Sequence, residues 1–258
     1  MSREINPAAE IGFGREAASY ASVRPSYPPR AVDVLADEGL APGSRVGDLA
    51  AGTGIFTRLL AAADYDVVAV EPIPAMREQL SAASPSLEVL DGTAESIPLP
   101  DGSLDSVTVA QAFHWFDAPL ALTEIARVLR PGGVLLMTWN VRDDSVGWVR
   151  AWSDIVNRLA GGRPYDDHRE RPWADVVAAS GRFSPVRSER VPSSFPTTPE
   201  AVVERTRSTS FVAALEPEPR QAVLDAIAAM LAEDPDTAGR SEFTFPNHTD
   251  VYWCHRLD

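Results

Sequence analysis

A bare turn between a strand and a helix most constrains how this 258-residue chain can fold. The stretch VGDLAAGTGIFTRLL, residues 46–60, joins a short apolar strand ending in aspartate to an amphipathic helix through small residues. Few or small Cβ atoms let such a turn bend tightly, take positive φ at glycine and expose its backbone to another molecule. A packed core has little use for so bare a turn, so we expect a ligand to lie against it.

Strand-like and helix-like segments alternate around this turn. The predicted strands are short, β-branched and apolar on both faces, as is typical of buried parallel strands. They cover residues 45–50, 66–71, 87–92, 104–111 and 132–140, with helical patterns at 29–38, 56–63, 75–83 and 120–129. This alternation predicts an α/β fold with a doubly wound, mostly parallel, seven-stranded Rossmann-like sheet.

The rhythm changes after residue 140. Helices are expected over 146–160, 172–180, 199–214 and 217–233, with a sixth strand inside 183–191 and a final strand-like segment at 243–257. We therefore expect three parts: an N-terminal arm (1–29) closing over a cofactor, a core (30–198 and 236–258), and a small helical cap (199–235). The cap is placed to cover the acceptor pocket.

Composition excludes several classes of partner. The formal net charge of −14 argues against a nucleic-acid partner and against docking on an anionic membrane. The single cysteine, Cys254, excludes an internal disulfide and is expected to be a buried thiol. His168 is expected to be solvated, and His248 and His255 have no convergent acids at ligand spacing, so no metal site is expected. With no apolar leader or membrane span in view, we expect a soluble, cytoplasmic protein.

The acids at the ends of the first two predicted strands indicate what kind of ligand binds. Open α/β sheets bind ligands beyond the carboxyl ends of their strands, beside the first strand. There Asp48 precedes the turn that contains Ala50, Gly52 and Gly54, while Glu71 ends the second strand. A carboxylate at the latter position can accept hydrogen bonds from both ribose hydroxyls, which predicts a nucleoside-containing cofactor. The third glycine of G-x-G-x-x-G is missing, which disfavours a nicotinamide dinucleotide.

These residues carry a family resemblance. The chain resembles class I S-adenosylmethionine-dependent methyltransferases, in which Asp or Glu precedes a G-x-G-x-G turn; here Ala50 stands where glycine is commonest. Glu71 matches the ribose-binding acid, and Thr93 stands where many relatives have an acid. The segments that carry the resemblance are DLAAGTG (48–54), DGTAESIPLPDGSLDSVTVA (91–110) and EIARVLRPGGVLLMTW (124–139). The resemblance implies S-adenosyl-L-methionine as cofactor and S-adenosyl-L-homocysteine as product.

Two further stretches resemble the small-molecule branch of this family. YASVRPSYP and AFHWFD are similar to segments of trans-aconitate methyltransferase-like and quinone-biosynthesis-like enzymes. The resemblance implies a small-molecule acceptor, with O-methylation of a carboxylate or hydroxyl favoured and N- or C-methylation as the alternative. A non-catalytic cofactor-binding protein and a nicotinamide-dependent oxidoreductase are weaker alternatives. The enzyme is expected to be a monomer or homodimer.

The resemblance also assigns the cofactor site. Asp48 would hold the amino group of the methionine moiety, or instead cap backbone N–H groups of the turn. Gln111 would face the sulfonium, and Arg24 would pair with the cofactor carboxylate while Tyr20 closes over the site. The full expected set is Tyr20, Arg24, Asp48, Ala50, Gly52, Gly54, Glu71, Pro72, Met76, Thr93, Ala94, Glu95 and Gln111.

The acceptor pocket is expected to involve His114, Trp115, Arg207 and Ser210. His114 follows the fourth strand and would accept a proton from a hydroxyl or amine acceptor, because imidazole titrates near neutral pH. The alternative is that His114 and Trp115 shape the pocket without proton chemistry. Arg207 or Ser210, on a helical face shared with Thr206, would meet an anionic acceptor.

Overall fold

The computed structural model describes residues 25–160 and 172–258, and the chain divides into two compact units. We call the first the sheet unit; its described residues are 26–140, 172–191 and 249–258. The second, the cap unit, holds residues 141–160 and 192–248. Along the chain, strands β5, β6 and β9 have residues in both units.

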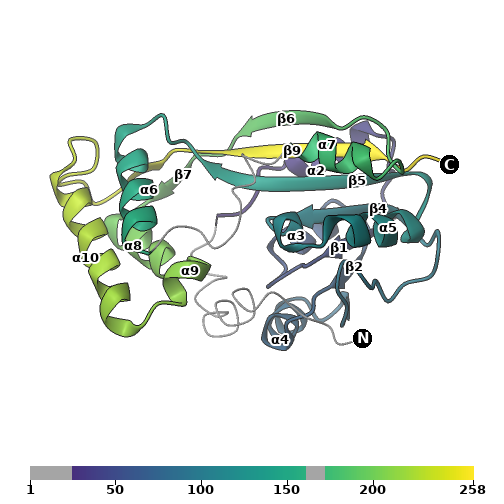
Figure 1. The fold of residues 1–258 in the computed structure, drawn as a ribbon, viewed down its shortest axis with the longest axis horizontal. Helices are drawn as coiled ribbons and strands as arrows, with labels where there is room; N and C mark the ends of the chain where they lie inside the picture. The colour runs from purple at the N-terminus through teal and green to yellow at the C-terminus, as the bar shows by residue number, and fades with distance from the viewer. Residues whose placement is uncertain (1–24, 161–171) are drawn as a thin grey trace. The chain divides into compact units, whose positions relative to one another are not determined.

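A seven-stranded sheet forms the sheet unit, in the order β3-β2-β1-β4-β5-β9-β6 (Figure 1). Its strands are β1 (Arg45–Leu49), β2 (Asp66–Val70), β3 (Glu88–Leu90), β4 (Leu104–Ala110), β5 (Leu129–Arg142), β6 (Arg187–Pro192) and β9 (Asn247–His255). The pairs β1–β2, β1–β4, β2–β3 and β4–β5 are parallel. The strand order therefore reverses between β1 and β4, and the predicted doubly wound, mostly parallel sheet is confirmed.

The last strand runs against its neighbour β5. The Arg256 N–H donates to the Gly133 carbonyl, while further along the Thr138 hydroxyl donates to the Asp250 carbonyl. Residue numbers thus rise on one strand as they fall on the other, which makes the pair antiparallel. The expected strand-like segment at 243–257 therefore completes the sheet. Cys254 on it is buried, as expected, and burial raises the pKa of its thiol to about 12.

Helices of the sheet unit lie close to their predicted positions. They are α2 (Arg30–Asp37), α3 (Ile55–Ala62), α4 (Pro74–Ala83), α5 (Ala118–Val128), α7 (Trp173–Ala179) and a short 3₁₀ helix, η1 (Phe113–Trp115). Local chemistry sets their ends. The Asp117 side chain accepts from Leu120 N–H and caps α5, and Pro74 occupies the first turn of α4, where its missing N–H costs nothing.

Apolar residues of α2 and α3 cover one face of the sheet. Leu35, Phe56 and Leu60 pack there with Val134 and Leu136 of β5. The residues of β5 that alternate with these valine and leucine side chains are also fully buried. Both faces of the central strands are therefore covered, which explains why those strands are apolar throughout.

The cap unit has its own apolar core. It contains α6 (Gly147–Leu159), α8 (Pro199–Arg207), α9 (Ser210–Ala213), α10 (Pro217–Glu233) and the antiparallel pair β7 (Phe195–Thr197) and β8 (Phe243–Phe245). Trp148 and Trp152 of α6 pack edge-on against Phe245. This packing joins α6 to the apolar core that α8, α10 and β8 share. None of the described helices is both long and apolar enough for a membrane crossing.

The single helix predicted over 199–214 is two helices. The hydroxyls of Ser208 and Thr209 both donate to the Arg205 carbonyl, and such bonds compete with the helical backbone pattern. Thr206 is fully buried and accepts a 2.7 Å hydrogen bond from the Trp152 indole. The expectation that Thr206 shares a pocket-facing surface with Ser210 is therefore wrong, because Thr206 belongs to the cap core.

Gly92 offers a test of this packing. A Cβ there would lie 2.5 Å from Pro98 Cδ and 2.7 Å from Val70 Cγ1, so Gly92→Ala should lower the free energy of unfolding by about 1–3 kcal/mol. Gly147→Ala is the matched control, because nothing lies within 4 Å of its Cβ position and the residue is exposed at the start of α6. It should match or exceed wild-type stability. Urea unfolding measures both, and equal stability of Gly92→Ala and wild type would contradict the packing described.

Candidate cofactor site

The turn after β1 holds three residues in the left-handed backbone region. Ala50, Gly52 and Gly54 have φ angles of 51°, 59° and 82°. Ala50 therefore takes the conformation that a glycine would favour, at a cost of about 1–2 kcal/mol for its Cβ. Because the alanine side chain is a single methyl group, the backbone of the turn remains nearly bare.

Glycine suits positions 52 and 54 of the turn for different physical reasons. A Cβ on Gly52 would meet only the Met76 sulfur, at 3.8 Å, so the backbone has room beside it. A Cβ on Gly54 would lie 2.8 Å from Leu80 Cγ of α4. Gly54 thus allows close packing beneath the turn, while Gly52 is where a ligand can approach the main chain.

Glu71 directly follows β2 and joins it to this turn. Its carboxylate accepts hydrogen bonds of 2.8 Å from the N–H groups of Gly52 and Ile73, and the residue is only 2% exposed. Burial raises the pKa of Glu71, and the two backbone bonds partly offset that rise. These bonds occupy two of about four acceptor positions on the carboxylate. The remaining positions suit the paired hydroxyls of a ribose.

Asp48 is buried at the end of β1. Its two oxygens accept hydrogen bonds from the hydroxyls of Thr57 (2.6 Å) and Thr108 (2.8 Å), and the residue is 1% exposed. Burial raises the pKa of Asp48 to about 6, and the two hydroxyl bonds limit the rise. Among the described residues, these hydrogen-bond partners of Asp48 are hydroxyls rather than the N–H groups of the turn. A buried carboxylate with neutral partners would be stabilised by a cationic ligand group.

Thr53, inside the same turn, is a candidate site residue that the sequence prediction did not include. It is 3% exposed, and its hydroxyl has no hydrogen-bond partner within the described part of the chain. A buried hydroxyl without a partner costs about 1–3 kcal/mol. The orphaned hydroxyl therefore fits a site that a polar ligand completes. In the sequence, the position of Thr53 between Gly52 and Gly54 is the feature that indicates this role.

Residues 93–95, which follow β3, form a second part of the candidate site. Thr93 forms a bridge with Ser96, and Ala94 is 4% exposed. The Glu95 carboxylate accepts from the Asp117 N–H at the start of α5. The side chain of Glu95 is thus engaged in supporting its loop, which leaves the backbone of this segment for contact with an adenine.

The residues after β2 are braced by an arginine. The Arg77 guanidinium donates 2.8 Å hydrogen bonds to the carbonyls of Glu71 and Pro72 and lies 3.2 Å from the Asp91 carboxylate. Met76, one residue earlier on α4, is buried and faces Gly52. Met76 therefore lies beside the bare turn, and Pro72 directly follows Glu71 in the chain.

Gln111 follows β4 with φ at 59°, a rare conformation for glutamine. Its N–H donates to the Thr138 carbonyl, and its side-chain Nε2 donates to the Asn140 carbonyl at 3.0 Å. The Asn140 amide oxygen in turn accepts a 2.6 Å hydrogen bond from Thr249. A network across three neighbouring strands therefore fixes Gln111 at the carboxyl end of β4.

His114 and Trp115 lie on η1, directly after Gln111 along the chain. The Trp139 indole N–H donates to His114 Nδ1 at 3.3 Å. The His114 and Trp115 rings are 5.0 Å apart and tilted by 42°. Both acceptor candidates of the sheet unit are thus next to each other, and an indole from β5 orients the imidazole.

The remaining predicted residues lie in the cap unit or outside the described residues. Arg207 lies in the cap unit and pairs with Glu204 at 3.1 Å, one turn earlier on α8. Ser210 begins α9, and its side chain is outside the described part of the structure. Tyr20, Arg24 and His168 lie outside the described residues. The expected site residues between 48 and 115 all belong to the sheet unit, where they lie at or after the ends of β1, β2, β3 and β4.

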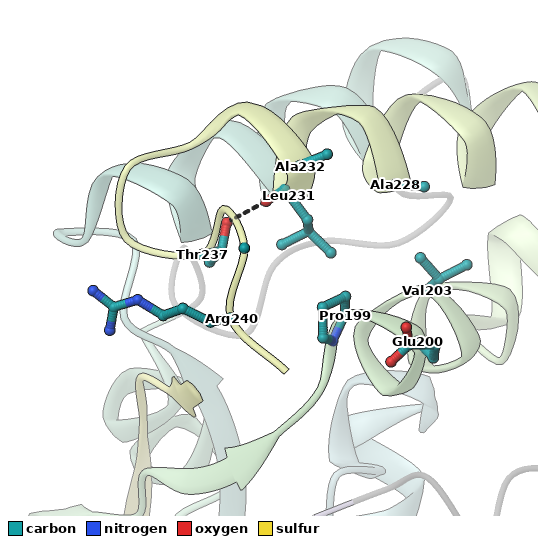
Figure 2. Close-up of a pocket in the computed structure, with 9 residues that line it drawn as sticks. Pro199, Glu200, Val203, Ala228, Leu231, Ala232, Thr237 and Arg240 are labelled. Carbon is teal, nitrogen blue, oxygen red and sulfur yellow. Dashed lines mark hydrogen bonds between the residues drawn. The ribbon is translucent and has the colours of Figure 1, made fainter. Parts of the chain in front are cut away.

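A separate cavity lies within the cap unit (Figure 2). It measures about 400 Å³ and is formed by α8, α10 and the loop after α10. In Figure 2, Pro199 and Val203 from α8 and Leu231 from α10 border the hollow, and Thr237 donates to the Leu231 carbonyl beside it. Arg207 is not among the described residues that line it.

Known proteins similar to this chain are methyltransferases. A family model described as "Methyltransferase domain" matches residues 47–137. Uncharacterized methyltransferase Rv3342 of Mycobacterium tuberculosis is 41% identical over 236 residues, covering 92% of each chain. Uncharacterized methyltransferase-like C25B8.10 of Schizosaccharomyces pombe is 36% identical over 230 residues, covering 87% of this chain and 89% of that protein.

Solved structures show the same fold. One is Haemonchus contortus phospholethanolamine N-methyltransferase 2 in complex with phosphomonomethylethanolamine and S-adenosylhomocysteine. Its TM-score is 0.60 at 15% sequence identity, over 99% of this chain and 60% of that one. At this identity the likeness concerns the fold alone.

Removing the charge of Asp48 should stabilise the free protein. Its pKa is about 6 in the folded state against an ordinary 3.8, so wild type loses stability as pH rises between these values. At pH 7.5 Asp48→Asn should gain up to about 3 kcal/mol, and the gain should vanish near pH 4. Urea unfolding across this range measures it. A variant less stable than wild type at pH 7.5, or a gain independent of pH, would contradict a buried carboxylate.

Thr53 and Thr57 form a matched pair for a second test. Thr53→Val removes a buried hydroxyl that has no hydrogen-bond partner among the described residues, so the free protein should be at least as stable as wild type. S-adenosylhomocysteine should bind to this variant about 5–30-fold more weakly. Thr57→Val removes a hydroxyl that donates to Asp48, so it should destabilise the free protein. Calorimetry and urea unfolding give both quantities. Undiminished affinity in Thr53→Val would exclude Thr53 as a ligand contact.

Proposed function

Because the chain belongs to the class I S-adenosylmethionine-dependent methyltransferases, we propose that it methylates an oxygen, of a carboxylate or a hydroxyl, on a small-molecule acceptor. The observation that carries this proposal is the arrangement around the turn after β1. Bare backbone at Gly52 and the orphaned Thr53 hydroxyl belong to this turn, and the Glu71 carboxylate is hydrogen-bonded to it.

Each described residue of this arrangement suits one part of the cofactor. Glu71 would hold the ribose hydroxyls, and Asp48 would stabilise the ammonium group directly or through water. The loop at 93–95 would flank the adenine, and Gln111 would lie at the sulfonium end. The bound cofactor would supply an electrophilic methyl group to an acceptor oxygen in line with the C–S bond, whose electron pair stays on sulfur. A hydroxyl acceptor would also give up its proton, for which His114 is the candidate base.

The protein's contribution to such a displacement is orientation and exclusion of water. Positioning two reactants can lower a barrier by about 7–11 kcal/mol without any proton transfer. The hydrogen-bond network around Gln111 and the indole contact to His114 fix side chains at the carboxyl end of β4. These contacts support an enzyme that relies on positioning when its acceptor is already a good nucleophile.

The predicted arm and cap residues complete the proposal. Arg24 would pair with the cofactor carboxylate, and Tyr20 would cover the site. In support, the Asn140 amide donates to the Ser26 carbonyl at 3.2 Å, so the chain enters the sheet unit beside the end of β5. In the cap unit, Arg207 or Ser210 would meet an anionic acceptor.

The alternative acceptor atoms are nitrogen and carbon. N-methylation, or C-methylation, of a small metabolite uses the same displacement, and the Haemonchus contortus neighbour is named as an N-methyltransferase. The net charge of −14 favours a small-molecule acceptor over nucleic acid or an anionic membrane. We further propose a cytoplasmic enzyme that works as a monomer or homodimer.

Calorimetric titration with S-adenosylhomocysteine tests the proposal. Glu71→Ala should weaken binding at least about 30-fold, because hydrogen bonds to a charged group contribute about 1.5–3 kcal/mol each. Glu88→Ala is the control, since this exposed acid of β3 pairs with Arg45 of β1 rather than with the turn. It should bind like wild type. Wild-type protein that binds no S-adenosylhomocysteine, or Glu71→Ala with unchanged affinity, would exclude the proposed site.

A further inference from the structure

We infer that Glu124 and Arg127 of α5 are positioning residues for the base of the cofactor: they fix the main chain that distinguishes adenine from a 6-oxopurine. This inference rests on the proposed function and deepens it, because it names what places the loop at 93–95. The observation behind it is a set of hydrogen bonds between this ion pair and the segment that directly follows the loop.

The side chains of the loop at 93–95 leave recognition of a base to the main chain. Ala94 carries only a methyl group, and the Glu95 carboxylate already accepts from the Asp117 N–H. Ala94 is 4% exposed, and within the described part of the chain its N–H and carbonyl have no hydrogen-bond partner. A buried peptide group without a partner is costly, so the peptide groups of Ala94 suit the polar edge of a ligand.

The segment after this loop is held by side chains of α5. Residues 97–100 lie in no helix or strand. The Arg127 guanidinium donates hydrogen bonds of 2.9 Å to the carbonyls of Ile97 and Leu99. The Glu124 carboxylate accepts from the Ile97 N–H at 3.1 Å. Ile97, two residues after the loop, is therefore fixed to α5 through both its N–H and its carbonyl.

The ion pair is itself rigid. Arg127 Nε and Nη2 donate to the two oxygens of Glu124 at 2.8 Å each, which is the bidentate geometry of a strong pair. Arg127 Nη1 also donates to Asp101 at 2.7 Å. With Ile97 and Leu99 as further acceptors, all five N–H donors of the guanidinium are used. The pair also lowers the pKa of Glu124, which keeps the carboxylate charged.

Loss of this support should affect the base more than the sugar. Adenine presents an amino donor beside the N1 acceptor, whereas a 6-oxopurine presents a carbonyl acceptor beside an N1–H donor. Main-chain groups held in one place match only one of these edges, while a loose loop can adapt to either. Glu71 and the turn after β1 would hold the ribose in both cases, because α5 makes none of the bonds of Glu71.

Calorimetric titration with S-adenosylhomocysteine and S-inosylhomocysteine measures this discrimination. Wild type should bind the adenine compound at least about 10-fold more tightly, because the wrong edge leaves polar groups unpaired. In Arg127→Ala the ratio of the two affinities should fall below about 3-fold, mainly through weaker binding of S-adenosylhomocysteine. Arg127→Lys keeps the charge but lacks the planar fork, so its ratio should lie between the two.

Arg30→Ala is the matched control. The Arg30 guanidinium also binds two carboxylates, those of Asp37 and Glu189, but it joins α2 to β6 and makes no bond to the loop. Its loss should lower the free energy of unfolding and leave the ratio of affinities unchanged. A ratio is the informative quantity because general destabilisation weakens the binding of both compounds equally.

Each outcome supports or overturns the inference. A wild-type ratio near one, an unchanged ratio in Arg127→Ala, or an equal fall of the ratio in Arg30→Ala would overturn it. If Arg127→Ala does not fold, Arg127→Lys and Glu124→Gln take its place, and an unchanged ratio in both overturns the inference. Wild-type protein that binds neither compound removes the proposed function and the inference with it. Discrimination by wild type that is independent of this pair removes the inference alone.

Discussion

The hydrogen bond from the Gly52 N–H to the Glu71 carboxylate holds the site together. It joins the turn after β1 to the end of β2, where the parallel sheet already sets the two strands side by side. One bond therefore places a bare stretch of backbone and an acid within reach of the same ligand. It also gives the turn a partner that keeps Gly52 in its left-handed conformation, and everything proposed about the cofactor depends on that placement.

This arrangement is costly without a ligand. Asp48 and Glu71 are both buried carboxylates whose pKa values are raised by burial, and Thr53 hides a hydroxyl without a recorded partner among the described residues. Each of these features lowers the stability of the free protein, and each becomes favourable once a ligand supplies donors or positive charge. Strain concentrated at one edge of an otherwise well-packed sheet is the pattern expected of a binding site.

Structural features that depend only on residues close together in the sequence could be predicted from it. The strand-helix alternation, the bare turn and Glu71 are local patterns, and the structure places them as predicted. Contacts between distant segments were out of reach. Thr108 meets Asp48 only through the pairing of β1 with β4, and Trp139 meets His114 from another strand. The break between α8 and α9 arises from two hydroxyls, whose effect on a helix depends on context.

A crystal structure of the full chain with S-adenosylhomocysteine tests the central claim most directly. The account predicts the adenosyl group against the backbone at Gly52, with both ribose hydroxyl oxygens about 2.6–3.2 Å from the Glu71 carboxylate. It also predicts that the Thr53 hydroxyl gains a polar partner. A nucleoside bound elsewhere, or a space at this turn filled by the protein's own side chains, would contradict it.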